Sequence, residues 1–209
     1  MILSEVYLTE DCHNGDMTLA EREHPMTRVL VLYFTRGGHT AKIANAIAQQ
    51  LMLRGAKVDL VDINSAAATK INWPDYQLVA LGACVLYGTY DKSVFQFIEQ
   101  HAPALSALPN SFFCVNVVAR NPEKRIPENN KYLQKFIALS PWTPADLKII
   151  AGKVDYPSWP WYDRLMIQLI MKITKGPTDP KAVIDYTDWE DVKVYADHLL
   201  TLAEVAEPA

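Results

Sequence analysis

The residues best suited to chemistry stand together in one short segment, residues 35–40, which reads TRGGHT. An apolar, β-branched run precedes the segment and a helical pattern follows it at once, so it is predicted to be a loop that enters a helix N-terminus. Two threonine hydroxyls, two glycines that permit close approach, and the unpaired N–H groups of a helix start suit a phosphate dianion. The spacing fits neither G-x-x-x-x-G-K-[ST] nor G-x-G-x-x-G. We interpret the segment as a site for a single phosphate, with an ordinary glycine-rich turn as the alternative.

Two further segments, residues 83–88 and 116–120, also follow apolar runs. Tyr87, with Tyr90 nearby, can cover the face of a planar heterocycle, although a core or surface tyrosine is the alternative. Backbone groups of both segments can hydrogen-bond the polar edge of such a ring. One phosphate joined to a flat heterocycle describes FMN, whereas FAD would need a second phosphate loop. The predicted cofactor site comprises Thr35, Arg36, Gly37, Gly38, His39, Thr40, Ala83, Cys84, Val85, Leu86, Tyr87, Gly88, Asn116, Val117, Val118, Ala119 and Arg120.

The elements that must position these loops alternate regularly between strand and helix patterns. Such alternation predicts an α/β fold, a doubly wound parallel sheet with helices on both faces. Five strands favour the flavodoxin-like order 2-1-3-4-5, in which a ligand lies beyond the carboxyl ends of the first, third and fourth strands. The last helix is expected to begin with a capping box at Thr187–Glu190. The five strands are predicted at Arg28–Phe34, Lys57–Ile63, Leu78–Ala83, Phe112–Ala119 and Leu147–Val154.

Composition excludes several classes of protein. The chain has 209 residues and a formal net charge of -4, which argues against a general nucleic-acid binder and favours one domain, placed at residues 27–205. Residues 1–26 are acidic and unpatterned, so they are interpreted as a polar extension rather than a signal peptide. Three scattered cysteines support neither a disulfide framework nor a metal site. The sequence lacks the nucleophile elbow that a hydrolase would need. The expected compartment is the cytoplasm.

Residues 155–180 interrupt the alternation after the fifth strand and are interpreted as an insert. Within it, Trp159–Lys175 carries polar residues on one narrow helical stripe and apolar residues over nearly all the rest. The run is shorter than the about 20 apolar residues that span a bilayer, so it either packs into the fold or lies peripherally in a membrane interface. We favour the interface because the stripe is basic and because Pro157 and Pro160 set the segment off from the fifth strand; Trp159, Trp161 and Tyr162 would then lie at headgroup level. The stripe consists of Arg164, Gln168, Lys172 and Lys175.

Four motifs together carry a resemblance to a known family. They are residues 34–40, residues 82–88, residues 115–125 (VNVVARNPEKR) and residues 161–167 (WYDRLMI). From Met26 to about Leu202 the chain resembles the bacterial, oxygen-independent protoporphyrinogen IX dehydrogenases, which are flavodoxin-like and menaquinone-dependent. The first motif is shared loosely by flavodoxins, and the last two are far more specific. One departure is Leu86, which stands where the family is expected to carry a basic residue.

The resemblance implies FMN-dependent oxidation of protoporphyrinogen IX to protoporphyrin IX in haem biosynthesis, with electrons passed to menaquinone or another respiratory quinone such as ubiquinone. It implies a location on the cytoplasmic face of the bacterial inner membrane. FMN carries the chemistry, and no catalytic side chain is assigned. Arg120, Lys124 and Arg125 follow the fourth strand and are predicted to form a basic rim for the substrate's propionates, with solvated loop charges that contact nothing as the alternative. The alternative is a flavodoxin-type electron carrier without a small-molecule substrate. A third possibility, an NAD(P)H:quinone reductase, is disfavoured because the sequence shows no recognisable dinucleotide fingerprint.

Overall fold

The computed structural model describes residues 26–173 and 176–205. The predicted polar extension, residues 1–26, lies outside the described residues except for Met26. Cys12 and Lys175 lie outside them as well. Of the other two cysteines, Cys114 is buried and Cys84 partly so, and both are free thiols.

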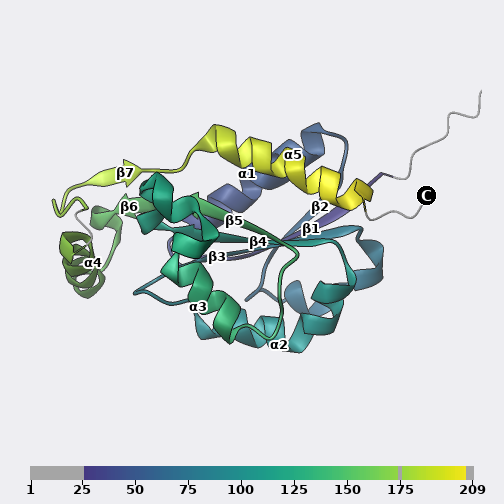
Figure 1. Ribbon diagram of the computed structural model, residues 1–209, viewed down its shortest axis with the longest axis horizontal. Helices are drawn as coiled ribbons and strands as arrows, with labels where there is room; N and C mark the ends of the chain where they lie inside the picture. The colour runs from purple at the N-terminus through teal and green to yellow at the C-terminus, as the bar shows by residue number, and fades with distance from the viewer. Residues whose placement is uncertain (1–25, 174–175, 206–209) are drawn as a thin grey trace, which may run out of the picture.

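A five-stranded parallel sheet in the order β2-β1-β3-β4-β5 forms the centre of the molecule, as predicted (Figure 1). The central strand β3 is buried over nearly its whole length because helices cover both faces of the sheet, which explains its continuous apolar sequence. The strands are β1 (Arg28–Phe34), β2 (Lys57–Asp62), β3 (Leu78–Cys84), β4 (Asn110–Asn116) and β5 (Asp146–Ala151).

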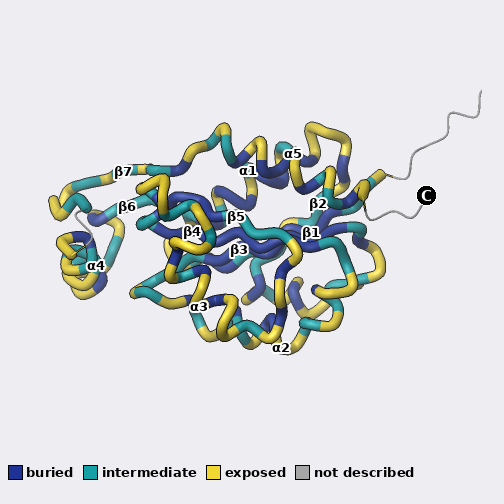
Figure 2. The backbone as a smooth tube through the Cα atoms, viewed as in Figure 1, coloured by how far each residue is buried: buried dark blue, intermediate teal, exposed yellow. Residues whose placement is uncertain are grey.

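Helices cover the sheet in two layers, α1 and α5 on one face and α2 and α3 on the other (Figure 1). Each layer encloses its own apolar cluster, one built around Phe112 and Phe136 and the other around Ile43 and Val192. The tube view shows the strands as the buried centre and the outer helix faces as exposed (Figure 2). The helices are α1 (His39–Leu53), α2 (Lys92–Ala107), α3 (Lys131–Leu139), α4 (Trp161–Ile173) and α5 (Trp189–Val205).

The predicted ends of the fourth and fifth strands are wrong. β4 begins at Asn110 and stops at Asn116, after which residues 117–120 form a 3-10 turn. β5 stops at Ala151, because the chain leaves the sheet at Gly152 and pairs elsewhere. Apolar runs continue past both strand ends because Val117 and Val154 pack in the cluster of the insert, while Ala119 is buried in the core beside the sheet.

The insert forms a small layer of its own beyond the carboxyl ends of the strands (Figure 1). Its short antiparallel pair consists of β6 (Lys153–Asp155) and β7 (Val183–Asp185), and helix α4 lies beside it. A third apolar cluster, centred on Val154, Tyr156 and Met171, joins α4 to this pair. The insert therefore has a core separate from the two layers on the sheet.

Candidate functional site

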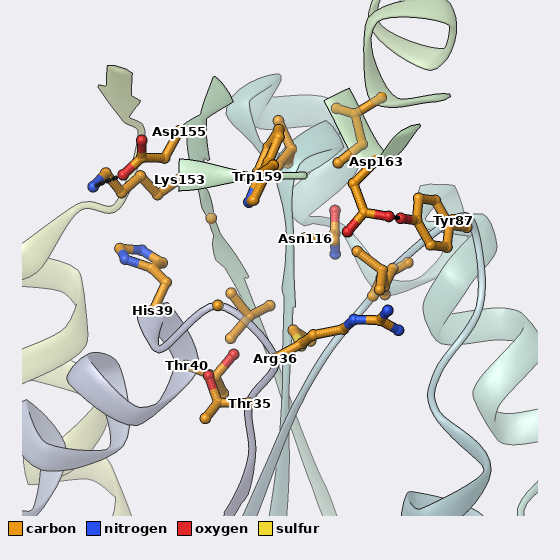
Figure 3. Close-up of a pocket in the computed structure, with 18 of the residues that line it drawn as sticks. Thr35, Arg36, His39, Thr40, Tyr87, Asn116, Lys153, Asp155, Trp159 and Asp163 are labelled. Atoms are coloured by element: carbon orange, nitrogen blue, oxygen red, sulfur yellow. Dashed lines mark hydrogen bonds and ion pairs between the residues drawn. The ribbon is translucent and has the colours of Figure 1, made fainter. Parts of the chain in front are cut away.

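A cavity of about 730 Å³ opens at the carboxyl ends of β1, β3 and β4. The three predicted loops converge there, as the sheet order requires. The insert closes the opposite side, so that the cavity lies between the sheet edge and α4 (Figure 3).

The first loop presents backbone and hydroxyl donors to this cavity. Gly38 adopts a left-handed conformation (φ 78°), which a side chain would strain, and it stands at the N-cap of α1 without any side-chain cap. The first N–H groups of α1 are therefore available to a ligand. Thr35 Oγ1 is buried and has no hydrogen-bond partner among the described residues, whereas the buried Thr40 hydroxyl contacts the Cys84 thiol. A buried hydroxyl without a partner is costly, so this loop is suited to an acceptor that the protein itself does not supply.

His39, the first residue of α1, ties the loop to the segment that precedes α5. Its Nε2 lies 2.7 Å from Thr187 Oγ1, and Thr187 in turn donates to the Ala151 carbonyl at 2.8 Å. Because the Thr187 proton is used in that bond, Nε2 of His39 must be the donor. Burial lowers the pKa of His39, although Asp185 lies 3.5 Å away and opposes the shift. Thr187 is thus not the predicted N-cap: Asp188 caps α5 by accepting from the Asp191 N–H.

The second loop makes a tight turn at Tyr87 and Gly88. Leu86 and Thr89 exchange backbone hydrogen bonds of 2.9 and 3.1 Å, and both central residues have positive φ, 50° at Tyr87 and 76° at Gly88. Such a conformation is uncommon for a bulky residue and often marks a functional position. The Tyr87 ring lines the cavity, and its hydroxyl donates to the carboxylate of Asp163 in α4 (Figure 3).

The third loop reaches the cavity through Asn116, Val117 and Val118. The Asn116 side chain is not free for a ligand, because Oδ1 accepts from the Ala119 N–H at 3.0 Å and Nδ2 donates to Cys114 Sγ at 3.1 Å. The third loop therefore presents to the cavity its backbone groups and the side chains of Val117 and Val118. Ala119 is buried in the core and does not line the cavity.

Several other predicted residues lie away from the cavity. Ala83 is completely buried in the sheet core. Tyr90 is also a core residue: its hydroxyl donates to Cys114 Sγ at 2.8 Å and its ring packs on Phe136, so the platform role considered for it is wrong. Arg120 contacts the Val117 carbonyl at 3.2 Å and does not line the cavity.

The basic rim proposed for residues 120–125 stays a prediction. Arg125 donates to the Ala119 carbonyl at 2.9 Å, and Lys124 lies 3.9 Å from Glu123; neither lines the cavity. The cations that do line it are Arg36, Lys42 and Lys153. Of these, Lys153 is paired at 2.6 Å with Asp155, whose pKa this hydrogen bond lowers.

The insert supplies a wall that the sequence analysis did not assign to the site. Trp159 places its indole over the first loop, with Nε1 4.0 Å from the position a side chain at Gly37 would take. The amphipathic pattern of residues 159–175 was the available signal, but it did not show which face of α4 turns inward. The inserted residues that line the cavity are Asp155, Ser158, Trp159, Pro160, Tyr162, Asp163, Ile167, Ile170 and Met171.

Comparisons with known proteins agree with this geometry. A family model described as a flavodoxin domain (Flavodoxin_5) matches residues 30–181. Protoporphyrinogen IX dehydrogenase (quinone) of Escherichia coli strain K12 is 39% identical over 177 residues, covering 85% of this chain and 97% of that protein. The protein of the same name from Leishmania major is 38% identical over 185 residues, covering 87% and 78%. Among solved structures, a Flavo Di-iron protein mutant from Thermotoga maritima shares the fold with a TM-score of 0.52 at 10% identity, covering 85% of this chain and 36% of that one.

Proposed function

Because this chain belongs to the family of quinone-dependent protoporphyrinogen IX dehydrogenases, we propose that it oxidises protoporphyrinogen IX to protoporphyrin IX and passes the electrons to a quinone. We further propose that its flavin is FMN, bound in the cavity at the carboxyl ends of β1, β3 and β4. One observation carries the cofactor assignment. The buried Thr35 hydroxyl lacks a partner beside the uncapped N-terminus of α1, where a phosphate dianion would satisfy both.

The described residues fit FMN rather than a larger flavin nucleotide. The cavity contains one loop with the properties of a phosphate site, at residues 35–40, and FMN carries one phosphate. Tyr87 and Trp159 offer aromatic surfaces on the same cavity, and the backbone of residues 84–88 and 116–118 offers polar groups for a ring edge. When bound, FMN supplies the hydride-accepting chemistry that no side chain of this site can supply.

The protein's own part is to bind the flavin, orient the substrates and shield the site from water. Ile167, Ile170 and Met171 turn apolar side chains toward the cavity, which suits a tetrapyrrole or a quinone ring and excludes water. A flavodoxin-type carrier exchanges electrons with proteins and needs no such wall. The insert therefore favours the enzyme over the carrier.

The test begins with flavin-free protein and measures the dissociation constants of FMN, FAD and riboflavin by fluorescence. We expect FMN to bind much more tightly than riboflavin, because riboflavin lacks the phosphate, and to copurify in place of FAD. Protoporphyrinogen IX should then reduce the bound flavin anaerobically, and a menaquinone analogue should reoxidise it. Flavin that binds normally but resists reduction by the porphyrinogen would indicate the electron carrier instead.

We also propose that α4 docks on the surface of a membrane that holds the quinone. Its outward face exposes large apolar side chains, with Trp161 76%, Leu165 62%, Leu169 56% and Ile173 74% exposed. A contiguous exposed apolar face of this kind marks an interaction surface. Met171, on the other side of the helix, is buried against the insert, which agrees with the packing alternative for that side of α4.

The charge of α4 supports this docking surface. Lys172, exposed in the last turn of α4, suits anionic headgroups, while Trp161 and Tyr162 stand at the start of the helix. The guanidinium of Arg164 instead donates to the Trp159 carbonyl at 3.2 Å. Gln168, the third described member of the polar stripe, donates to the Thr178 carbonyl at 2.9 Å. Within residues 26–173 and 176–205, no helix is sufficiently long and apolar to span a bilayer.

A further inference from the structure

We propose that the Asp163 carboxylate accepts the proton that porphyrinogen oxidation releases from a pyrrole N–H. The inference rests on the proposed function. In the first two-electron step a bridging carbon would lose a C–H bond together with its electron pair, as hydride, to the flavin that the proposed function supplies as oxidant. The N–H bond of a neighbouring pyrrole breaks at the same time; its electrons enter the conjugated system, and its proton forms an O–H bond on Asp163. The substrate thus loses two electrons and two hydrogens, and Asp163 later returns its proton to solvent.

Among the carboxylates that line the cavity, Asp163 alone has neither a lysine, an arginine nor a histidine at ion-pair distance within the described residues. Asp155 is paired with Lys153 at 2.6 Å. Asp185 faces His39 at 3.5 Å and accepts the Thr187 N–H at 3.0 Å. Asp163 instead accepts a neutral hydrogen bond from Tyr87. A carboxylate that is not held in an ion pair keeps an oxygen for a donor in the cavity.

The location of Asp163 suits a group that meets the substrate. It lies in the first turn of α4 and is 8% exposed, although it is ionisable. Burial of such a group without a cation is costly and is typical of functional positions. Its neighbours one and two turns along the helix, Ile167 and Ile170, line the same cavity.

Tyr87 holds the Asp163 carboxylate between the second loop and helix α4. Its hydroxyl binds Oδ1 of Asp163, and its backbone belongs to the turn predicted to hold the flavin ring (Figure 3). The bond leaves Oδ2 for a donor in the cavity. A substrate lying between the second loop and the apolar wall of α4 would therefore bring an N–H within reach of Asp163, which is the geometric requirement for a base.

The decisive variant is Asp163→Asn, which keeps the size of the side chain and its hydrogen bond from Tyr87. We expect anaerobic single-turnover reduction of the bound flavin by protoporphyrinogen IX to slow by about 100-fold or more, the usual contribution of a positioned base. Reoxidation of chemically reduced protein by a menaquinone analogue should keep its rate. FMN affinity should be unchanged, as should protoporphyrin IX binding to the FMN-free protein measured by tryptophan quenching.

Three further variants separate a base from a structural residue. Asp163→Glu should recover part of the rate, and added formate should restore activity to Asp163→Ala. Asp179→Asn, a carboxylate of the same insert outside the cavity, is the matched control and should behave as wild type. Wild-type reduction rates in Asp163→Asn would overturn the proposal, and so would loss of FMN or porphyrin binding in step with the rate. Failure of wild-type protein to oxidise the porphyrinogen would refute the proposed function instead.

Discussion

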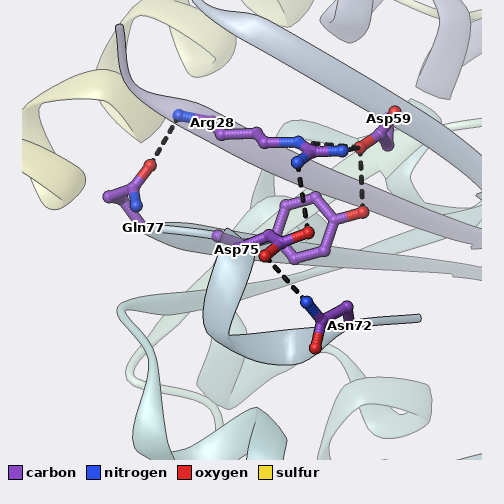
Figure 4. Close-up of polar contacts among 6 residues, drawn as sticks. Arg28, Asp59, Asn72, Asp75 and Gln77 are labelled. Atoms are coloured by element: carbon purple, nitrogen blue, oxygen red, sulfur yellow. Dashed lines mark hydrogen bonds and ion pairs between the residues drawn. The ribbon is translucent and has the colours of Figure 1, made fainter. Parts of the chain in front are cut away.

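The two ends of the central sheet differ in whether their polar side chains are paired with one another. At the amino ends, Arg28 donates to Asp59 at 2.9 Å and to Asp75 at 3.2 Å, while Tyr76 donates to Asp59 at 2.8 Å (Figure 4). These side chains therefore satisfy one another's hydrogen bonds. At the carboxyl ends, Thr35 keeps a buried hydroxyl without a partner. Satisfied polar groups indicate a structural role, and unsatisfied ones indicate a place for a ligand.

The direction of the chain explains this difference. In a parallel sheet the helix that follows each strand begins at the carboxyl edge, so helix N-termini gather there. Asp91 caps α2 and Asn130 caps α3, whereas α1 has no side-chain cap. α1 begins in this way after Gly38, with its positive dipole end toward the cavity. At the amino edge the side chains of Arg28, Asp59, Asp75 and Tyr76 pair with one another. The Trp142 indole N–H before β5 is the exception there, since it is buried without a partner among the described residues.

The strongest test of this contrast is the double substitution Thr35→Val, Thr40→Val. If the carboxyl end binds a phosphate dianion, each lost hydrogen bond to a charged group costs roughly 1.5–3 kcal/mol, so FMN affinity should fall by at least about 100-fold. Stability of the flavin-free protein should not fall in the Thr35→Val single variant, because the hydroxyl has no partner to lose. Thr69→Val, an exposed threonine far from the cavity, is the matched control. Unchanged FMN affinity in the double variant would refute the phosphate assignment.

A second test concerns the outward face of α4, which lies at the same end of the molecule. Leu169→Glu with Ile173→Glu should reduce flotation with anionic vesicles by at least about tenfold, since each side chain contributes up to 1.5–3 kcal/mol when buried. FMN content should be retained, because both side chains are exposed. Leu139→Glu changes an equally exposed leucine on α3 and should leave flotation intact. Flotation that survives the double substitution would exclude α4 as the docking surface.

The smallest expected effect lies at the amino ends. Asp59→Ala removes the shared acceptor of Arg28 and Tyr76. The Arg28 and Asp59 side chains are partly exposed, although Tyr76 is buried, so the free energy of unfolding should fall by only about 1 kcal/mol. FMN affinity should not change, because the network is remote from the cavity. Urea unfolding of the flavin-free protein and FMN titration measure the two quantities. A loss of FMN affinity here would show that the two ends are coupled, contrary to the comparison.

The sequence alone determined those features that depend on neighbouring residues. The apolar runs predicted the strands of the sheet, and their alternation with helices predicted its order. The phosphate loop could be recognised because its hydroxyls, glycines and helix start all lie within residues 35–40. The amphipathic character of residues 159–175 was visible for the same reason, since a helix repeats every few residues.

Only the tertiary structure decided which distant residues meet. Tyr87 and Asp163 are 76 residues apart, and His39 and Thr187 are 148 apart, so no local pattern could pair them. Tyr90 looked like a partner of Tyr87, yet the turn at Gly88 directs it into the core. Likewise, periodicity shows that α4 has apolar sides but not which of them faces the cavity. That choice depends on the packing of Met171 against Val154 and Tyr156, because contacts between separate elements determine how a helix is rotated.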